Sequence, residues 1–365
     1  SSPSRGLGDV YKRQVFVINL DKYFKTNLYI FQTFFMKIII TGGRQSNSSL
    51  SYFNKEWSNG VRGIILEYDT DSKKIEEKFV YETPEELRPK NDYSISFKSG
   101  SIHQGKLYVT TLTEILILSL PDYKIIDKIS LNIFNDLHHV IYVKGFLYIV
   151  VTGLDLTIEY DLDKKKISKF FNCYREKKTW ERFSKKVDYR KINTTKPHFS
   201  HPNHVTIFNK KLYITRYKQQ DVIVYKLNGD YLRIIELNNG IPHDGSIFND
   251  EFIYTTVTGK IIKVNKKNES IKDIIDLNKF AVDDCSLGWC RGYNFCNDMN
   301  YVGFSRIRPT KFMENIKWLG SKINDKYKLK MPTRVEIYNK NFTKIVDTIE
   351  LEKVGLNWIF SILNY

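Results

Sequence analysis

The sequence predicts an all-β fold, a six-bladed β-propeller of four-stranded antiparallel blades. One phrase recurs along the chain: a polar residue, a short apolar strand, a tight turn, and a second strand with an aliphatic–Tyr pair. It opens at Ser99, His139, His204 and Asp244. Repetition at about 40 residues is typical of propeller blades. After Met36 the chain also consists of short β-rich runs separated by polar turns, and no long stretch has a helical period.

The repeats assign strands to blades two to six. Each predicted blade begins with the strand nearest the centre of the ring and continues outward through hairpins. The predicted strands are 94–103, 106–111, 114–120 and 123–131 in blade two; 139–143, 146–152, 156–161 and 166–171 in blade three; 204–208, 211–216, 221–227 and 231–237 in blade four; 244–248, 252–257, 260–265 and 271–277 in blade five; and a segment from 288, then 301–307, 334–339 and 344–351 in blade six.

The first blade is predicted to take strands from both ends of the chain. Segments 36–42, 63–69 and 75–81 match the second, third and fourth strands of the other blades, but an innermost strand is missing there. Segment 357–363 resembles such a strand and has no other assignment. We therefore expect the C-terminal strand to join the first blade, because this closure removes an open sheet edge. The count is six blades, with five or seven as alternatives.

Residues 36–365 are predicted to form the single propeller, interrupted by insertions at 172–200 and 308–332. Long insertions in a compact fold are often lids or binding loops, and solvated decorations are the alternative. Segment 1–35 is predicted to be a non-native or disordered leader, since residues 1–14 look like translated adaptor sequence. The natural start then falls at Met36. Without a convincing signal peptide, the protein is expected to be cytoplasmic.

The composition narrows the class of partner. The formal charge is +16, from 57 basic and 41 acidic residues. Such a charge can mark nucleic-acid binding, but the lysines are scattered through turns and no nucleic-acid motif is present, so no specific nucleic acid is expected. The apolar segment 27–40 is shorter than the roughly 20 residues of a spanning helix, so no membrane span is expected. The four cysteines form no CxxC pair, which argues against a structural zinc site.

Polar residues are predicted to ring one mouth of the central channel, where the innermost strands begin. At each strand, either of two neighbouring residues can occupy the ring position, because the sequence does not fix the register to one residue. The candidate pairs are Lys98/Ser99, His138/His139, Asn203/His204, His243/Asp244, Arg291/Gly292 and Asn357/Trp358.

The histidines of this ring predict metal or acid–base chemistry. Neutral imidazole is the commonest metal ligand and a natural general base near neutral pH. His139, His204 and His243 are therefore candidate ligands of one divalent metal ion and candidate catalytic residues. Asp244 is a further catalytic candidate, and Asn203 and His138 are candidates for substrate binding. The alternative is a hydrogen-bonded polar plug that fills the channel.

Local spacing adds three expectations. His201 should approach the same mouth as His204, from a loop that Pro202 restrains, whereas His198 is expected at the surface. A His243–Asp244 dyad is not expected, because neighbouring residues on a strand point in opposite directions. Asp155 falls in a hairpin, and the sequence does not decide at which end of the channel this hairpin lies.

Three arginines predict an anionic substrate. Arg291 opens blade six, and Arg306 and Arg308 follow on the next strand and loop. Arginine suits bidentate recognition of carboxylate or phosphate groups. Structural ion pairs are the alternative. Cys290 could be a nucleophile beside an imidazole, but a buried thiol is the commoner situation.

The segments 137–155, 201–216, 241–259 and 288–318 resemble the DUF4915-like group of bacterial six-bladed propellers of unknown function. More distantly, the repeat resembles the superfamily of calcium-dependent lactonases and strictosidine synthase-like propellers. That resemblance implies a metal held in the channel by carboxylate and amide side chains. This chain offers histidines there instead, with Asn203 and Asp244 beside them.

Together these patterns predict a small-molecule site at the channel mouth. It would be a metal-assisted hydrolase or lyase acting on a polar, anionic substrate, which Arg291, Arg306 and Arg308 would bind. The alternative is a non-catalytic binding or scaffold propeller for a protein or carbohydrate partner.

Overall fold

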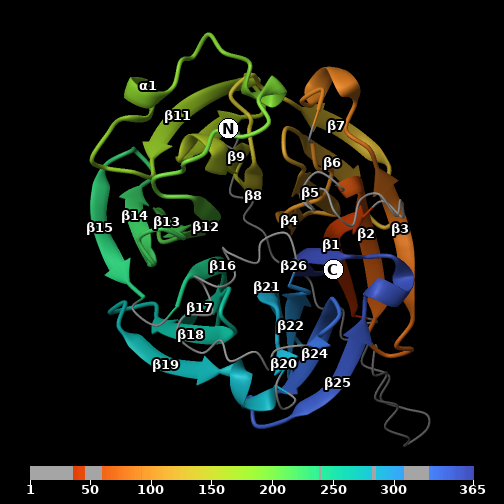
Figure 1. Cartoon of the computed structure of the whole chain (residues 1–365). Coiled ribbons are helices and arrows are strands. Elements are labelled where there is room, and N and C mark those ends of the chain that lie inside the picture. Colours follow the sequence, from red (N-terminus) through yellow and green to blue (C-terminus); the bar gives the residue numbers. More distant parts are fainter. Residues whose placement is uncertain (1–35, 46–59, 92, 238–239, 282–284, 308–328) are drawn as a thin grey trace, which may run out of the picture. The chain divides into compact units, whose positions relative to one another are not determined.

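The protein is a ring of six antiparallel sheets. The computed structural model describes residues 36–45, 60–91, 93–237, 240–281, 285–307 and 329–365. Within these residues, six sheets contain four strands each, and every innermost strand contacts its two neighbours around the ring, in the order β4, β8, β12, β16, β21, β26 (Figure 1). The predicted six-bladed propeller is confirmed.

The strand bounds follow the predicted blades closely. Listed from the innermost strand outward, they are β26 (Trp358–Asn364), β1 (Lys37–Gln45), β2 (Gly60–Asp69) and β3 (Ile75–Tyr81); β4 (Gly100–His103), β5 (Lys106–Thr110), β6 (Ile115–Ser119) and β7 (Ile125–Ile129); β8 (Leu137–Val143), β9 (Phe146–Val151), β10 (Leu156–Asp161) and β11 (Lys166–Asn172); β12 (Pro202–Phe208), β13 (Lys211–Arg216), β14 (Asp221–Lys226) and β15 (Tyr231–Glu236); β16 (Pro242–Phe248), β17 (Glu251–Thr256), β18 (Lys260–Asn265) and β19 (Ile271–Asp276); and β21 (Trp289–Cys296), β22 (Met299–Ser305), β24 (Arg334–Asn339) and β25 (Ile345–Glu350).

The shorter elements lie in the connections. A two-stranded parallel sheet joins β20 (Cys285–Ser286) to β23 (Leu329–Lys330). The helical segments are η3 (Glu85–Leu87), η4 (Thr152–Leu154), α1 (Thr179–Arg182), η5 (Tyr189–Lys191), η6 (Leu277–Phe280) and η9 (Glu352–Val354).

The two ends of the propeller share one blade, as the sequence predicts. Strand β26 pairs antiparallel with β1, so that Ile362 lies opposite Ile40. At the outer end of this pair, Lys37 and Tyr365 exchange two backbone hydrogen bonds. The ring is therefore held closed by hydrogen bonds between residues more than 300 positions apart in the chain, and the edge of β1 is covered.

The core lies between the blades. Six apolar clusters each join one blade to the next, and together they complete the circle. The middle strands carry continuous buried runs because both their faces are covered, as in β14. The outermost strands alternate between partly buried and exposed residues, as in β25. This pattern is expected where one face meets water.

Five of the six innermost strands have a register shift near their start, and blade two has a related hydrogen bond just before β4. In β8, Leu137 lies opposite Val151 and His139 opposite Val150, so His138 is an extra residue. Strands β12, β16, β21 and β26 have register shifts at the equivalent place. In blade two the backbone N–H of Lys98 donates to Thr110 just before β4 begins. A bulge of this kind places two successive side chains where regular pleating would place one.

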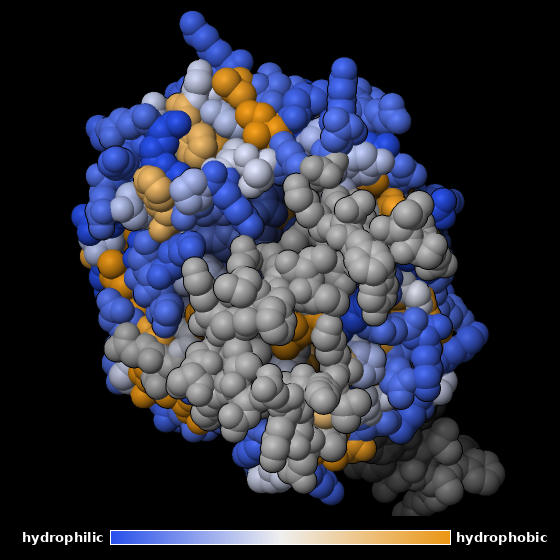
Figure 2. Space-filling model, in the orientation of Figure 1, coloured by the Kyte–Doolittle hydropathy of each residue, from blue (hydrophilic) through white to orange (hydrophobic). Residues whose placement is uncertain are grey.

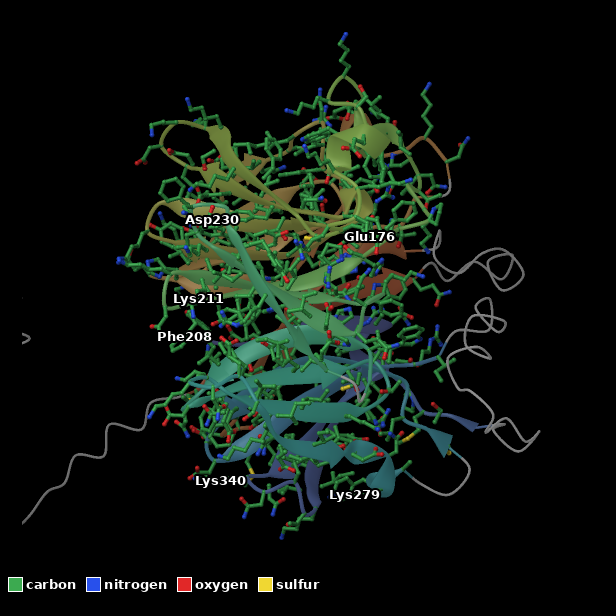
Figure 3. The ribbon with its side chains drawn as sticks, turned by 90° about the vertical axis from the view of Figure 1, so that its left-hand side faces the viewer. Glu176, Phe208, Lys211, Asp230, Lys279 and Lys340 are labelled. Carbon is green, nitrogen blue, oxygen red and sulfur yellow. The ribbon has the colours of Figure 1, made fainter. Side chains whose placement is uncertain are left out.

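The propeller has two unlike faces (Figure 3). Glu176, in the segment between β11 and β12, lies on one of them; Phe208 and Lys211, beside the β12–β13 turn, lie on the other. We call these the insertion face and the hairpin face. Figure 2 views the insertion face, where the described surface is mainly hydrophilic with small separate apolar groups. Among the described residues, no helix is long and apolar enough to span a bilayer.

Two predicted segments fall outside the description. Residues 1–35, the predicted leader, are not described, nor are residues 308–328, which include Arg308 and most of the second predicted insertion.

Candidate channel site

The bulges bring one residue from each blade to a common level of the channel. We call this set the bulge layer: Lys98, His138, Asn203, His243, Arg291 and Phe360. Each member is at the same register position in its own blade. Residues far apart in sequence thereby meet around one axis.

Phe360 occupies the middle of the bulge layer. The Lys98 Nζ atom lies 4.0 Å from the centre of its ring, and the Arg291 guanidinium carbon lies 4.7 Å from it. The rings of His138 and His243 lie 6.4 and 6.5 Å from it, centre to centre. Four blades therefore converge on one aromatic ring. Cations over an aromatic face are electrostatically favourable, more so where water is excluded.

Three side chains of the bulge layer carry a buried polar atom without a hydrogen-bond partner among the described residues. These atoms are His243 Nε2, Asn203 Oδ1 and Arg291 Nε. All three side chains are more than nine-tenths buried. Buried polar groups are normally paired, and an unpaired group costs about 1–3 kcal/mol. The layer therefore has unused hydrogen-bonding capacity: Arg291 Nε–H can donate, and Asn203 Oδ1 can accept.

The structure corrects the ring position predicted for the closing blade. The pair Asn357/Trp358 was expected at the channel, but the register places Phe360 and Ser361 there. Strand β26 begins at Trp358, and the Asn357 N–H donates to Gly43 at the far end of β1. A polar ring position is thus replaced by the aromatic centre of the layer.

A second correction concerns His243 and Asp244, which were not expected to interact. The His243 Nδ1 atom lies 2.9 Å from Asp244 Oδ1. The bulge explains this contact, because Pro242 and Gly245 are opposite Thr256 and Tyr254, so both residues share one partner position. Strand alternation is interrupted there, and the two side chains meet. The other carboxylate oxygen accepts from the Gly292 N–H.

One residue further along each strand, a second layer lines a cavity that opens toward the hairpin face. Its members are Ser99, His139, His204, Asp244, Gly292 and Ser361, and all six belong to the lining of a cavity of about 340 Å³. The rings of His139 and His204 are stacked with centres 3.7 Å apart. The Val205 N–H donates to His139 Nδ1 over 3.4 Å.

Burial keeps these two imidazoles neutral. It lowers the pKa of His204 to about 4, against the opposing attraction of Asp244. It lowers the pKa of His139 well below its usual value, and the neighbouring His204 lowers it further. Desolvation disfavours the charged form of histidine. Both rings are therefore uncharged at neutral pH, which permits their close stacking.

On the insertion side of the bulge layer, Asp136, His198 and His201 form a group that could hold a metal ion. One ligand atom of each lies within 4.8 Å of the others. Two nitrogen ligands with one carboxylate match the donor sets of zinc and similar divalent ions. The His138 ring lies 5.3 Å from that of His201, which joins this group to the bulge layer.

The hydrogen bonds around His198 prepare it as a ligand. Thr195 donates its hydroxyl to the Gly153 carbonyl, so its oxygen can accept from His198 Nε2–H, 3.2 Å away. This assignment leaves a lone pair on Nδ1, which lies 2.7 Å from the Nδ1 atom of His201. Metal-binding histidines commonly donate their other N–H in this way. In this tautomer the His201 Nδ1–H donates to His198 Nδ1, so a metal ion would have to displace that proton. Burial lowers the pKa of both His198 and His201, so both rings are neutral at neutral pH.

Asp155 holds the backbone that carries these histidines. Its carboxylate accepts from the backbone N–H groups of Phe199, Ser200 and His201, at 2.8 to 2.9 Å. Arg182, from α1, donates to the same carboxylate over 2.6 Å. The sequence did not decide at which end of the channel Asp155 lies. The structure places Asp155 at the end that carries the metal-capable group, where Asp155 positions the loop of His198 and His201.

Two of the three predicted arginines, Arg291 and Arg306, are described, and their surroundings differ. Arg291 is in the bulge layer; burial lowers its pKa to about 10, so it stays protonated at neutral pH. Arg306 instead donates to Gln45 Oε1 over 2.6 Å and lies 3.5 Å from Glu352, away from the cavity lining. Cys290 is fully buried, and burial raises the pKa of its thiol well above its usual value, as expected of an inert core cysteine.

The predicted site residues are thus distributed over adjoining levels. His138, Asn203, His243 and Arg291 are in the bulge layer, and His139, His204 and Asp244 line the cavity. The sequence missed Asp136, and it placed His198 at the surface, whereas this side chain is 6% exposed. The usable signal was the His-x-x-His spacing of His198 and His201, just before an innermost strand.

Comparisons with known proteins extend no further than the fold. No model of a protein family matches the chain, and no curated protein matches it. Among solved structures it is similar to a protein of unknown function from Bacteroides caccae, at 12% identity and a TM-score of 0.57, over 90% of this chain and 98% of that one. It is also similar to a chain of a nidogen/laminin complex, at 10% identity and a TM-score of 0.53, with the same coverage.

Proposed function

We propose that the mouth of the channel on the insertion face is a metal-dependent site, which cleaves a small anionic substrate by hydrolase or lyase chemistry. The observation that carries the proposal is the adjacency of two features. A group of two histidines and one aspartate lies beside a layer in which buried polar atoms have no partner.

The metal-capable group favours a reactive site over a structural one. Structural zinc sites are usually closed by four protein ligands, whereas catalytic sites use three and leave a position for water or substrate. Asp136, His198 and His201 supply three. Ligands of a tetrahedral zinc ion lie about 3.3 Å apart. The nitrogens of His198 and His201 would therefore separate by roughly 0.6 Å from their present 2.7 Å.

The bulge layer favours an anionic substrate. Lys98 and Arg291 lie over the same aromatic ring. Arg291 has a buried Nε–H with no acceptor among the described residues. A carboxylate or phosphate placed above Phe360 would accept from this guanidinium. His243 Nε2 and Asn203 Oδ1 would hold its polar remainder, which fits the earlier expectation for Asn203.

Each part has a chemical role when the site is loaded. A bound divalent metal supplies Lewis-acid polarisation of a carbonyl or lowers the pKa of a bound water. The residues of the chain bind the substrate's charge and orient it. His138 is held by a hydrogen-bond contact of 2.9 Å between its Nδ1 and the Asp136 carbonyl, which orients its other nitrogen. We also propose, from the sequence resemblance, that the chain is related to the DUF4915-like propellers and more distantly to the lactonase-like propellers.

Metal content tests the first half of the proposal. After chelation and reloading with Zn²⁺ or Mn²⁺, the wild type should retain one ion per chain by elemental analysis. His198→Gln and His201→Gln should each lose it, at least 10-fold in affinity. His103→Gln is the matched control, because His103 stacks on Tyr142 at the other end of β4. His139→Gln and His204→Gln should keep the ion, because the proposed group does not contain these residues, which the sequence predicted as ligands.

Anion binding tests the second half. Citrate and phosphate should raise the unfolding midpoint of the metal-loaded wild type, since a ligand that binds only the folded state stabilises it. Arg291→Met should abolish that rise, whereas Arg62→Met, which removes an exposed arginine of β2, should preserve it. A protein that binds no metal and no anion, yet captures a macromolecule through its surface loops, would instead be a scaffold propeller.

A further inference from the structure

The cavity lined by the second layer lies beyond the bulge layer, and the proposed metal site does not use it. Two rings of side chains line it at successive inward-facing positions of the innermost strands. The upper ring is Ser99, His139, His204, Asp244, Gly292 and Ser361, and the lower ring is Ser101, Ile141, Thr206, Ser246, Asn294 and Leu363. Because the two positions are two residues apart on every strand, both rings point to the axis.

Hydroxyls are the commonest polar groups in the lining of this cavity, and they come from Ser99, Ser101, Thr206, Ser246, Tyr293 and Ser361. The other polar side chains are two imidazoles, two amides and one carboxylate. Ser101 accepts from the Tyr142 N–H, so its own hydrogen is available to a ligand. The buried Ser246 Oγ has no hydrogen-bond partner among the described residues. Hydroxyls both donate and accept, and they therefore match ligand hydroxyls.

The described lining of the cavity offers no lysine or arginine to a ligand, and its one carboxylate is already hydrogen-bonded. The chain contains 57 basic residues, yet none of the described residues that line the cavity is Lys or Arg. Its carboxylate, Asp244, already contacts His243 Nδ1, the Gly292 N–H and the Thr255 hydroxyl. A buried charged ligand would need a compensating charge. An anionic or cationic ligand is therefore disfavoured here.

Apolar side chains complete the walls between the hydroxyls. Ile141, Val205, Ile253 and Ile362 alternate with the polar residues around the lining. Small-molecule sites commonly combine such apolar surface with a few placed polar groups, in volumes from about 300 Å³ upward. The cavity of about 340 Å³ is at the small end of this range.

We infer that this cavity on the hairpin face is a binding site for a small neutral polyhydroxylated molecule, of the class of monosaccharides and cyclic polyols. Its hydroxyls would pair with Ser101, Thr206 and Ser246, and its apolar faces would rest on the isoleucines. The inference depends on the cavity alone and not on the proposed metal chemistry.

Binding of defined probes tests the inference. D-glucose, D-galactose and myo-inositol, each at 100 mM, should be compared with citrate on the wild type in the presence of a chelator. At least one neutral probe should raise the unfolding midpoint by about 2 °C, whereas any rise with citrate should disappear in Arg291→Met, because citrate would bind at the bulge layer. Calorimetric titration should give a 1:1 complex for that probe.

Ser246→Leu fills the cavity and should abolish the shift. Thr206→Val keeps the size of that side chain and should weaken binding about 10-fold through the lost hydroxyl. If Ser246→Leu fails to fold, Thr206→Val carries the test. His198→Gln, on the other side of Phe360, should bind the probe as the wild type does. No shift with any neutral probe, or an equal shift in Thr206→Val, would overturn the inference.

Discussion

His204 illustrates how burial sets the behaviour of single residues in this channel. Its imidazole is stacked on His139 inside the cavity lining, and burial lowers its pKa to about 4. An unfolded chain would protonate it near pH 6.5. The unfolded state therefore binds more protons than the folded state between these two values, so stability falls as the pH falls through this window.

Replacing His204 should reduce this acid sensitivity. In His204→Gln, the loss of unfolding free energy between pH 7 and pH 5 should be about 2 kcal/mol smaller than in the wild type. Urea denaturation at the two pH values measures it. Equal losses in the two proteins would show that His204 is protonated as readily in the folded state as in the unfolded chain.

Asp155 is the second residue whose replacement is informative. It is 1% exposed, and it receives Arg182 as well as three backbone N–H groups. Asp155→Asn removes the charge and leaves Arg182 without its partner, so the unfolding free energy should fall by about 3 kcal/mol. Metal affinity should fall as well, because the loop carrying His198 and His201 loosens. If metal affinity is unchanged in Asp155→Asn, the loop that Asp155 holds does not position the metal ligands.

At the scale of elements, closure of the ring depends on β26 fitting tightly against β1. A Cβ atom on Gly42 would lie 2.0 Å from the Trp358 carbonyl oxygen, which is backbone and cannot yield. Gly42→Ala should therefore cost at least about 3 kcal/mol of unfolding free energy. Gly229→Ala is the control, because a Cβ atom on Gly229 would meet nothing within 4 Å. Its positive φ alone should lower the unfolding free energy by about 1 kcal/mol. Equal losses would contradict a tight closure.

The strands were predictable because their signals are local. Alternation, turn residues and repetition mark nearly every element, and the missing inner strand of blade one pointed to 357–363. Bulges have no comparable signal. The register shift in β26 brought Phe360 to the axis in place of Trp358, and the one in β16 joined His243 to Asp244. Both depend on pairing with a neighbouring strand, which a single segment does not encode.

At the scale of the whole molecule, the channel brings together residues that the sequence could only list as candidates. The repeats correctly gathered His138, Asn203, His243 and Arg291, because equivalent positions of equivalent blades must meet at the axis. Asp136 and His198 lie outside the repeat, in connecting segments on the insertion face. Their meeting depends on Asp155 and Arg182, which fold the segment between β11 and β12 back over the ring. Tertiary contacts of this kind leave no periodic trace.

The proposed metal site is most directly tested by the crystal structure of the zinc-loaded protein, recorded at the zinc absorption edge. We predict one anomalous peak at the channel mouth, about 2.0–2.2 Å from a nitrogen of His198, a nitrogen of His201 and an oxygen of Asp136. A peak among His139, His204 and His243 instead, or no ordered zinc within reach of Asp136, would contradict the account.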